Sequence, residues 1–212
     1  ILESVEHGEH LGRYSFLGVG PKQIVEVRGR RALLADGGHC QGTVLAGEDG
    51  LHLVQRLLAG CRVASVPGLP RFFGGAIGYV GYDMVRFFEK VPMPERDELG
   101  LPDALFLLTD TIVIFDHVQN RMKIVANAQI DGDPVQAYGA ATGKIDEIAA
   151  SLKRPLPKLQ VRVHANPGKL LSNVSQGEFE ERVRRAKDYI AAGDAFQIVL
   201  SQRFRRKTSA DA

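Results

Sequence analysis

The stretch that most restricts the fold is "ALFLLTDTIVIFDHVQNRMKIVANA", which covers residues 104–128. Its apolar runs are too continuous for a sheet with one face in water. The segment therefore predicts two long core strands that are joined through Asp116 to Arg121. Shorter strands are expected at "ILES", "YSFLGV", "QIVEVRG" and "RALLA", and the last two are expected to form a hairpin that turns near Gly29 and Arg30. These patterns predict antiparallel sheet.

Three segments have apolar residues at helical spacing, within 47–60, 134–152 and 175–193. Pro134 suits the first turn of its helix, since a proline there loses no hydrogen bond. Each of the other two segments ends on a glycine, Gly60 or Gly193, which we expect in the left-handed position after a helix. In the first segment the predicted apolar face consists of Leu51, Val54, Leu57 and Leu58.

A change in composition marks a domain boundary at "KRPLPKLQVRVHANPGK", which holds three prolines and five Lys or Arg. Such a stretch is typical of an extended connector. We expect one domain over residues 1–152, a connector over 153–172, and the start of a second domain over 173–212. The expected fold class is α+β, with an antiparallel, sheet-rich, sandwich-like first domain flanked by helices. The first helix and strand of the second domain should follow it.

Charge does not identify a partner, because 27 basic and 25 acidic residues leave a formal net charge of +2. The basic run "RFRRKT" lacks the interleaved aromatic residues of a single-strand binding surface, so no nucleic-acid partner is predicted. No run approaches about 18 apolar residues, so we expect no membrane segment. The use of only two cysteines fits a reducing compartment, so a cytoplasmic location is expected. Cys40 and Cys61 match no metal or redox spacing and are predicted to be small buried side chains.

The glycine-rich stretch "RFFGGAIGYVGYDMVRFF" matches neither of the two common phosphate-binding motifs. Its glycines instead predict a strand that passes close to a neighbouring element, with the aromatic residues filling the core. The stretch "EHGEH" offers His7 and His10 as possible metal ligands, but a polar turn is favoured there. No acidic cluster able to hold a divalent metal stands out in this chain.

Five blocks, in order along the chain, resemble the anthranilate synthase component I family: "ILESVE", "GRYSFLG", "FFGGAIGYVGYD", "LPDALFLLTDTIVIFDH" and "SNVSQGEFEERVRRAKDYIAAGDAFQIVLSQRF". The resemblance implies an enzyme that converts chorismate and ammonia to anthranilate and pyruvate with Mg²⁺. A glutamine amidotransferase subunit would supply the ammonia, and tryptophan would act as feedback inhibitor. Para-aminobenzoate synthase component I is the nearest alternative. A non-catalytic module that senses an amino acid is another.

The resemblance also implies site residues for the effector. The family's "LLES" motif stands here as "ILES", which places Leu2, Glu3 and Ser4 in the tryptophan pocket. Tyr14 and Ser15 are weaker candidates for the same pocket. From the residues alone, Ser4 is equally well explained as a strand-end serine that bonds its own backbone. Family members continue well beyond this segment and carry their Mg²⁺ ligands there, so this chain is expected to hold none and to be inactive alone.

Gln197 is the unusual residue of the last block, because it stands in front of the apolar run "IVL" in a predicted strand over 196–204. Relatives that form isochorismate or salicylate have a lysine in the same context, which resembles a general base for water. An amide has no useful pKa and only donates or accepts hydrogen bonds. The resemblance therefore implies that Gln197 faces the chorismate pocket without activating water. The alternative is a core glutamine bonded to a neighbouring backbone.

Overall fold

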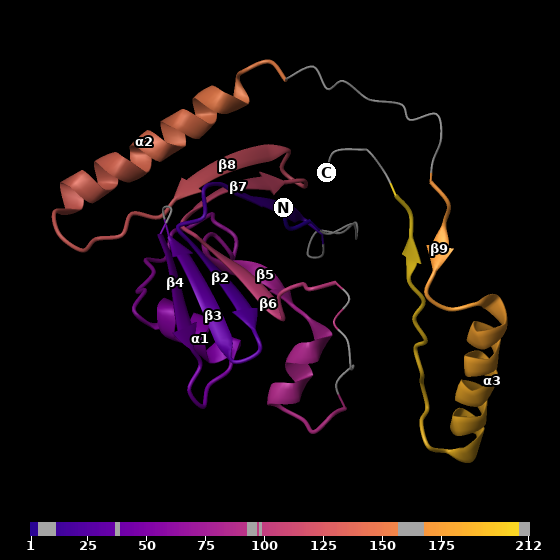
Figure 1. The fold of residues 1–212 in the computed structure, drawn as a ribbon. Helices are drawn as coiled ribbons and strands as arrows, with labels where there is room; N and C mark the ends of the chain where they lie inside the picture. The colour runs from indigo at the N-terminus through magenta and orange to yellow at the C-terminus, as the bar shows by residue number, and fades with distance from the viewer. Residues whose placement is uncertain (4–11, 37–38, 93–96, 98, 157–167, 208–212) are drawn as a thin grey trace. The chain divides into compact units, whose positions relative to one another are not determined.

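The computed structural model describes residues 1–3, 12–36, 39–92, 97, 99–156 and 168–207 (Figure 1). The chain divides into two compact units, Ile1–Arg154 and Pro155–Ala212, and each is treated by itself. The division lies at the start of the predicted connector. The finer borders at 152 and 172 stay predictions.

The first unit contains a five-stranded antiparallel sheet in the order β4-β3-β2-β6-β5. The predicted hairpin is confirmed, because β2 and β3 pair with Arg28 opposite Arg31. Its strands are β2 Gln23–Arg28, β3 Arg31–Asp36, β4 His39–Val44, β5 Gly75–Val80 and β6 Ala104–Thr109. Helix α1, Gly50–Ala59, and the 3-10 helix η1, Tyr82–Phe87, contribute to the core that this sheet buries.

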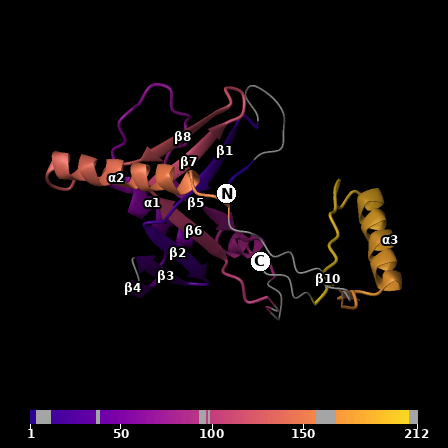
Figure 2. The ribbon, with the colours of Figure 1, turned by 90° about the horizontal axis from the view of Figure 1, so that it is seen from above.

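A second, three-stranded antiparallel sheet has the order β1-β7-β8. Its strands are β1 Tyr14–Gly18, β7 Thr111–Asp116 and β8 Arg121–Ala126. Helix α2, Pro134–Leu152, has the predicted bounds and lies along β8, as Figure 2 shows from above. Lys144 of α2 forms an ion pair with Asp110 at 3.0 Å, which ties the helix to the bend before β7.

The predicted single strand before Asp116 is wrong, since the chain bends at Asp110 and divides it into β6 and β7, which belong to different sheets. The bend is satisfied locally: the Thr109 hydroxyl donates to the Thr111 carbonyl at 2.9 Å, and the Asn127 amide donates to the Asp110 carbonyl at 3.0 Å. Because β7 is almost entirely buried and β6 is at least half-buried along its length, the apolar pattern continues through the bend. Apolar patterning reports burial and does not report which sheet a strand joins.

Helix α1 differs in detail from its prediction. Asp49 caps it by accepting from the backbone N–H groups of Leu51 and His52 at 2.8 and 3.0 Å. The buried face contains Leu53, which the prediction omitted, while Leu51 is exposed. Gly60 is right-handed at φ −78°, so its predicted left-handed conformation is wrong. Leu57 and Leu58 pack against the core as predicted, so the observed apolar face consists of Leu53, Val54, Leu57 and Leu58.

The prediction of two buried cysteines is also wrong, because both Cys40 and Cys61 are exposed. Cys40 lies on β4, the edge strand of the larger sheet, where neighbours cover less of each side chain. Cys61 follows the end of α1. At an edge strand and after a helix end, a cysteine side chain is not needed to fill the core, so both cysteines remain exposed.

The glycine-rich stretch behaves as predicted at β5, where Gly78 passes closely against β6. A Cβ atom on Gly78 would lie 1.8 Å from the Leu105 carbonyl oxygen. The aromatic residues are only partly as predicted. Phe87 packs against the core, whereas Tyr82 and Phe88 are exposed.

We expect Gly78→Ala to destabilise the first unit by about 1–3 kcal/mol, the usual cost of overpacking, because the added methyl group meets a backbone atom that cannot swing away. The matched control is Gly42→Ala on β4, where nothing lies within 4 Å of the added atom. Urea unfolding of both variants measures the difference. Equal stability of the two variants would contradict this reading of β5.

The second unit consists of helix α3, Gln176–Ala192, and the short antiparallel pair β9 Leu171–Ser172 with β10 Phe204–Arg205. Ser175 and Glu178 form a reciprocal capping box, and Gly193 is left-handed at φ 85°, as predicted. The predicted strand over 196–204 is wrong apart from its end. Among the described residues, no strand pairing includes residues 196–203, and the side chains of Phe196 and Val199 are exposed.

Candidate functional site

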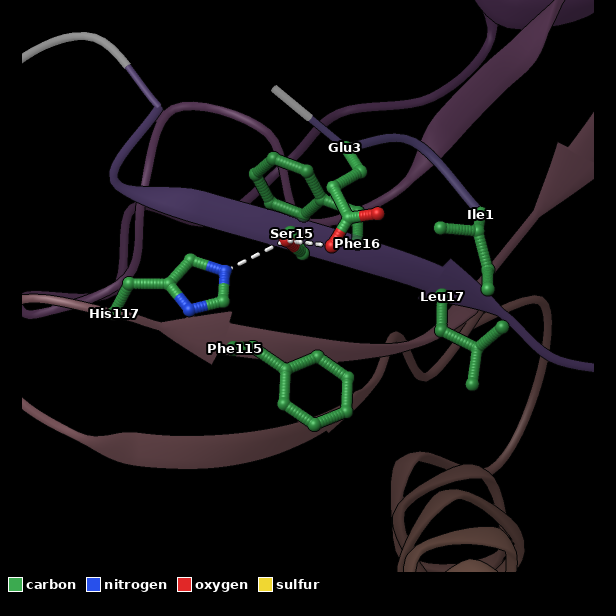
Figure 3. Close-up of a pocket in the computed structure, with 7 residues that line it drawn as sticks. All are labelled: Ile1, Glu3, Ser15, Phe16, Leu17, Phe115 and His117. Carbon is green, nitrogen blue, oxygen red and sulfur yellow. Dashed lines mark hydrogen bonds between the residues drawn. The ribbon is translucent and has the colours of Figure 1, made fainter. Parts of the chain in front are cut away.

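A pocket of about 240 Å³ lies in the first unit, where the N-terminal residues meet the three-stranded sheet (Figure 3). Its walls combine apolar side chains with three groups able to form hydrogen bonds. The lining residues are Ile1, Glu3, Ser15, Phe16, Leu17, Phe115 and His117. The pocket therefore suits a small ligand with both an apolar and a polar end.

Strand register brings these residues together. Leu2 and Phe16 exchange two backbone hydrogen bonds, each of 2.8 Å, as an isolated antiparallel bridge. In that register Glu3 stands opposite Ser15. On the other side of β1, Ser15 pairs with Phe115 of β7. Because side chains alternate along a strand, the odd-numbered residues of these segments share one face of the sheet.

Three polar side chains form a chain across this face. The Ser15 hydroxyl lies 2.7 Å from Nε2 of His117, and it donates to Oε1 of Glu3 at 3.4 Å. Ser15 is buried, whereas Glu3 and His117 are exposed. A buried hydroxyl thus connects an acidic and a basic group that both reach the pocket (Figure 3).

An ion pair between the part-exposed Arg13 and the buried Asp116 holds the backbone beside His117. Arg13 donates to both carboxylate oxygens of Asp116, at 3.0 and 2.8 Å, and the Asp116 carboxylate also accepts from two N–H groups of the following turn. Hydrogen bonds from Arg13 lower the pKa of Asp116 from 3.8 to about 2. The backbone N–H of His117 in turn donates to the Arg13 carbonyl at 2.9 Å. These contacts fix the position from which His117 reaches the pocket.

The structure brings together two of the five effector residues that the resemblance implied, Glu3 and Ser15. Leu2 forms the bridge to β1 but does not line the pocket, and neither does Tyr14, which alternates with Ser15 along the strand. Arg13 stacks on Tyr14 instead, 4.9 Å from the ring centre. Ser4 lies outside the described residues, as does the "EHGEH" segment, so the roles expected for them stay predictions.

No motif in the sequence points to His117 as a site residue. Residue spacing carries no signal for it, because His117 and Ser15 are separated by 102 positions. Knowledge of the pairing of β1 with β7 would have identified His117, because this register places residue 117 near residue 15 on the same face of the sheet.

Gln197, the candidate for the chorismate pocket, belongs to the second unit and is exposed. Among the described residues it forms no side-chain hydrogen bond, which does not fit the alternative of a core glutamine bonded to a neighbouring backbone. Its predicted role at chorismate stays a prediction.

The part of the chain that the structure describes contains no group of three His, Cys, Asp or Glu side chains that could hold a metal ion. In the same described ranges, no helix has the length and apolar character needed to cross a membrane.

Comparisons with known proteins agree with the fold and with the resemblance. A family model for chorismate binding enzymes matches residues 7–212. The chain is 34% identical over 209 residues to anthranilate synthase component 1 of Acetivibrio thermocellus, covering 96% of this chain and 42% of that protein. It is 39% identical over 214 residues to a probable anthranilate synthase component 1 of Schizosaccharomyces pombe, covering 98% and 40%.

A solved structure is similar to this chain as well. The crystal structure of anthranilate synthase component I from Streptococcus pneumoniae TIGR4 matches all of this chain and 44% of that one, with a TM-score of 0.72 and 26% identity. The predicted α+β class is confirmed. The chain spans less than half the length of these relatives. On the match over residues 7–212, the chain belongs to the family of chorismate binding enzymes.

Proposed function

We propose that the chain is the N-terminal part of an anthranilate synthase component I. In this proposal the whole protein converts chorismate and ammonia to anthranilate and pyruvate in tryptophan biosynthesis. It works in the cytoplasm, with Mg²⁺ held by residues outside this chain and ammonia supplied by a glutamine amidotransferase subunit. The observation that carries the proposal is the match of nearly the whole chain to proteins named anthranilate synthase component 1.

The pocket around Ser15 supports tryptophan as an inhibitor. Its volume of about 240 Å³ lies just below the range of about 300–1,000 Å³ that is typical of drug-sized ligands, so an amino acid is of suitable size. Ile1, Leu17 and Phe115 offer an apolar wall for an indole ring. The Glu3 carboxylate offers a negative charge for the ammonium group.

The second unit supplies the chorismate side of the proposal. We place Gln197 in the chorismate pocket of the whole protein, as the resemblance implies. Its exposure, with that of Phe196 at 95% and Val199 at 82%, leaves this segment free to pack against further parts of the protein. An amide at this position leaves delivered ammonia as the nucleophile, because it does not act as a base for water.

The test is an assay of the polypeptide encoded by the whole reading frame, with chorismate, Mg²⁺ and ammonium. We expect anthranilate and pyruvate as products, and inhibition by added tryptophan. Inhibitor binding can be followed directly by isothermal titration calorimetry.

Each alternative predicts a different outcome of that assay. Aminodeoxychorismate without pyruvate release would assign the protein to the para-aminobenzoate branch. Tryptophan binding without any turnover of chorismate would favour a module that senses an amino acid. Either result would overturn the proposed function.

A further inference from the structure

The number of hydrogens on each of the three polar groups of the pocket determines which group donates to which. The Ser15 hydroxyl has one hydrogen, and the Glu3 carboxylate, when ionised, only accepts. If Ser15 donates to Glu3, then Nε2 of His117 has to carry a hydrogen and donate to the Ser15 oxygen, over the 2.7 Å that separates them. All three groups then have a partner. If Ser15 donates to His117 instead, its hydrogen bond to Glu3 is lost.

Glu3 is the least restrained of these three groups. Ser15 lies inside β1, which pairs with β7 along its whole length. The backbone of His117 is held by the Arg13 carbonyl and by the turn that Asp116 organises. Among the described residues, by contrast, only the Leu2–Phe16 bridge ties the segment of Glu3 to the sheet. A side-chain restraint therefore matters most at Glu3.

We propose that His117 is a positioning residue of the effector pocket: its Nε2–H orients the Ser15 hydroxyl, which holds one oxygen of the Glu3 carboxylate and leaves the other to accept from the ammonium group of an amino acid. This inference rests on the proposed function. It assigns to His117 a role in the affinity for the effector and none in the chemistry on chorismate. His117 acts through Ser15, without touching the reacting atoms.

The test compares His117→Leu and His117→Gln in the polypeptide of the whole reading frame. Leucine removes the donor, whereas the amide of glutamine places an N–H near the position of Nε2. For each variant, the tryptophan concentration for half-inhibition is measured relative to its own uninhibited rate. We expect a rise of about tenfold for His117→Leu, equivalent to about 1.4 kcal/mol, because the Ser15 hydroxyl is no longer oriented toward Glu3. His117→Gln should stay within about threefold of the unaltered protein.

Two further variants separate this role from a general effect on folding. Ser15→Ala breaks the same connection, so combining it with His117→Leu should add little beyond either change alone. His39→Leu, on the exposed edge strand β4 and away from the pocket, should leave inhibition unchanged. Thermal melts check that each variant is folded. If His117→Leu is unfolded, Ser15→Ala and His117→Gln carry the test.

The outcomes distinguish this inference from the function on which it rests. If the unaltered protein makes anthranilate but neither binds nor responds to tryptophan, the proposed effector site fails, and the role of His117 with it. Inhibition that is normal in the unaltered protein and unchanged by His117→Leu would overturn the positioning role alone. Equal weakening of inhibition by leucine and by glutamine would also overturn it, because the effect would then not depend on an N–H donor at this position.

Discussion

Given chorismate, Mg²⁺ and ammonium, the 212-residue chain by itself should form no measurable anthranilate, while the polypeptide of the whole reading frame should form it readily. Enzymes accelerate their reactions by at least about a million-fold, and a chain without the catalytic groups loses that entire factor. This is the largest effect that we expect. Anthranilate fluorescence, with chromatography of the products, measures it.

Two structural observations motivate the expectation. The described residues present no group of side chains that could hold Mg²⁺. Gln197, the residue placed at chorismate, lies in an exposed segment that pairs with no strand in the described part of the chain. The pocket around Ser15, which is formed within the first unit, suits an effector and contains no such catalytic set.

A folded control is needed, because an unfolded chain is inactive for a trivial reason. Far-ultraviolet circular dichroism and a cooperative thermal melt of the chain supply it. If the folded chain formed anthranilate at a rate near that of the whole polypeptide, the catalytic groups would lie within these residues and the proposed division of function would be wrong.

The second large effect should follow from Asp116→Asn. Asp116 is 1% exposed and accepts from Arg13 and from the backbone N–H groups of Val118 and Gln119. The substitution removes the charge of a buried carboxylate that accepts two hydrogen bonds from Arg13 and two from the backbone, and loss of such charge-assisted bonds at a buried group is destabilising. We expect the melting temperature to fall by roughly 10 °C. Differential scanning calorimetry measures the change.

The same pair predicts how stability depends on pH. The pKa of Asp116 is about 2 in the folded protein and 3.8 in the reference state. A lowered pKa stabilises the fold fully above the unfolded value, and this stabilisation is lost as the pH falls from 3.8 toward 2. Asp116→Asn should therefore lose less stability than the unaltered protein across this interval.

The matched control is Glu48→Gln, another change from acid to amide. Glu48 pairs with Arg56, but both side chains are exposed, at 43% and 58%. Exposed pairs contribute little to stability, so its melting temperature should barely move. Similar melting temperatures for the Asp116 and Glu48 variants would show that the Arg13–Asp116 pair does not stabilise the first unit.

Local sequence determined the elements whose signals lie within a few residues. The bounds of α2, the capping box of α3, the left-handed Gly193 and the β2–β3 hairpin could all be predicted. Each depends on interactions between neighbours in the chain, such as a side chain that caps the adjacent helix end. Such signals are strong because no distant segment is needed to produce them.

Errors arose where a distant contact decides the outcome. The exposure of Cys40 depends on β4 being an edge strand, and the bend at Asp110 depends on which strands β6 and β7 pair with. The apolar pattern is the same whether one strand continues or two strands are joined by a bend. Burial alone therefore does not separate the two possibilities.

The candidate site also combines residues that the sequence predicts with a residue that only the tertiary structure reveals. Through motif resemblance, the sequence predicted Glu3 and Ser15 for an effector pocket, and the structure places both at one pocket. Only the tertiary structure added His117 and oriented Tyr14 away, because the register of β1 against β7 selects which side chains share a face. A shift of one residue in that register would exchange the two faces. Register is set by hydrogen bonds between segments about a hundred residues apart, and no local pattern along the chain encodes it.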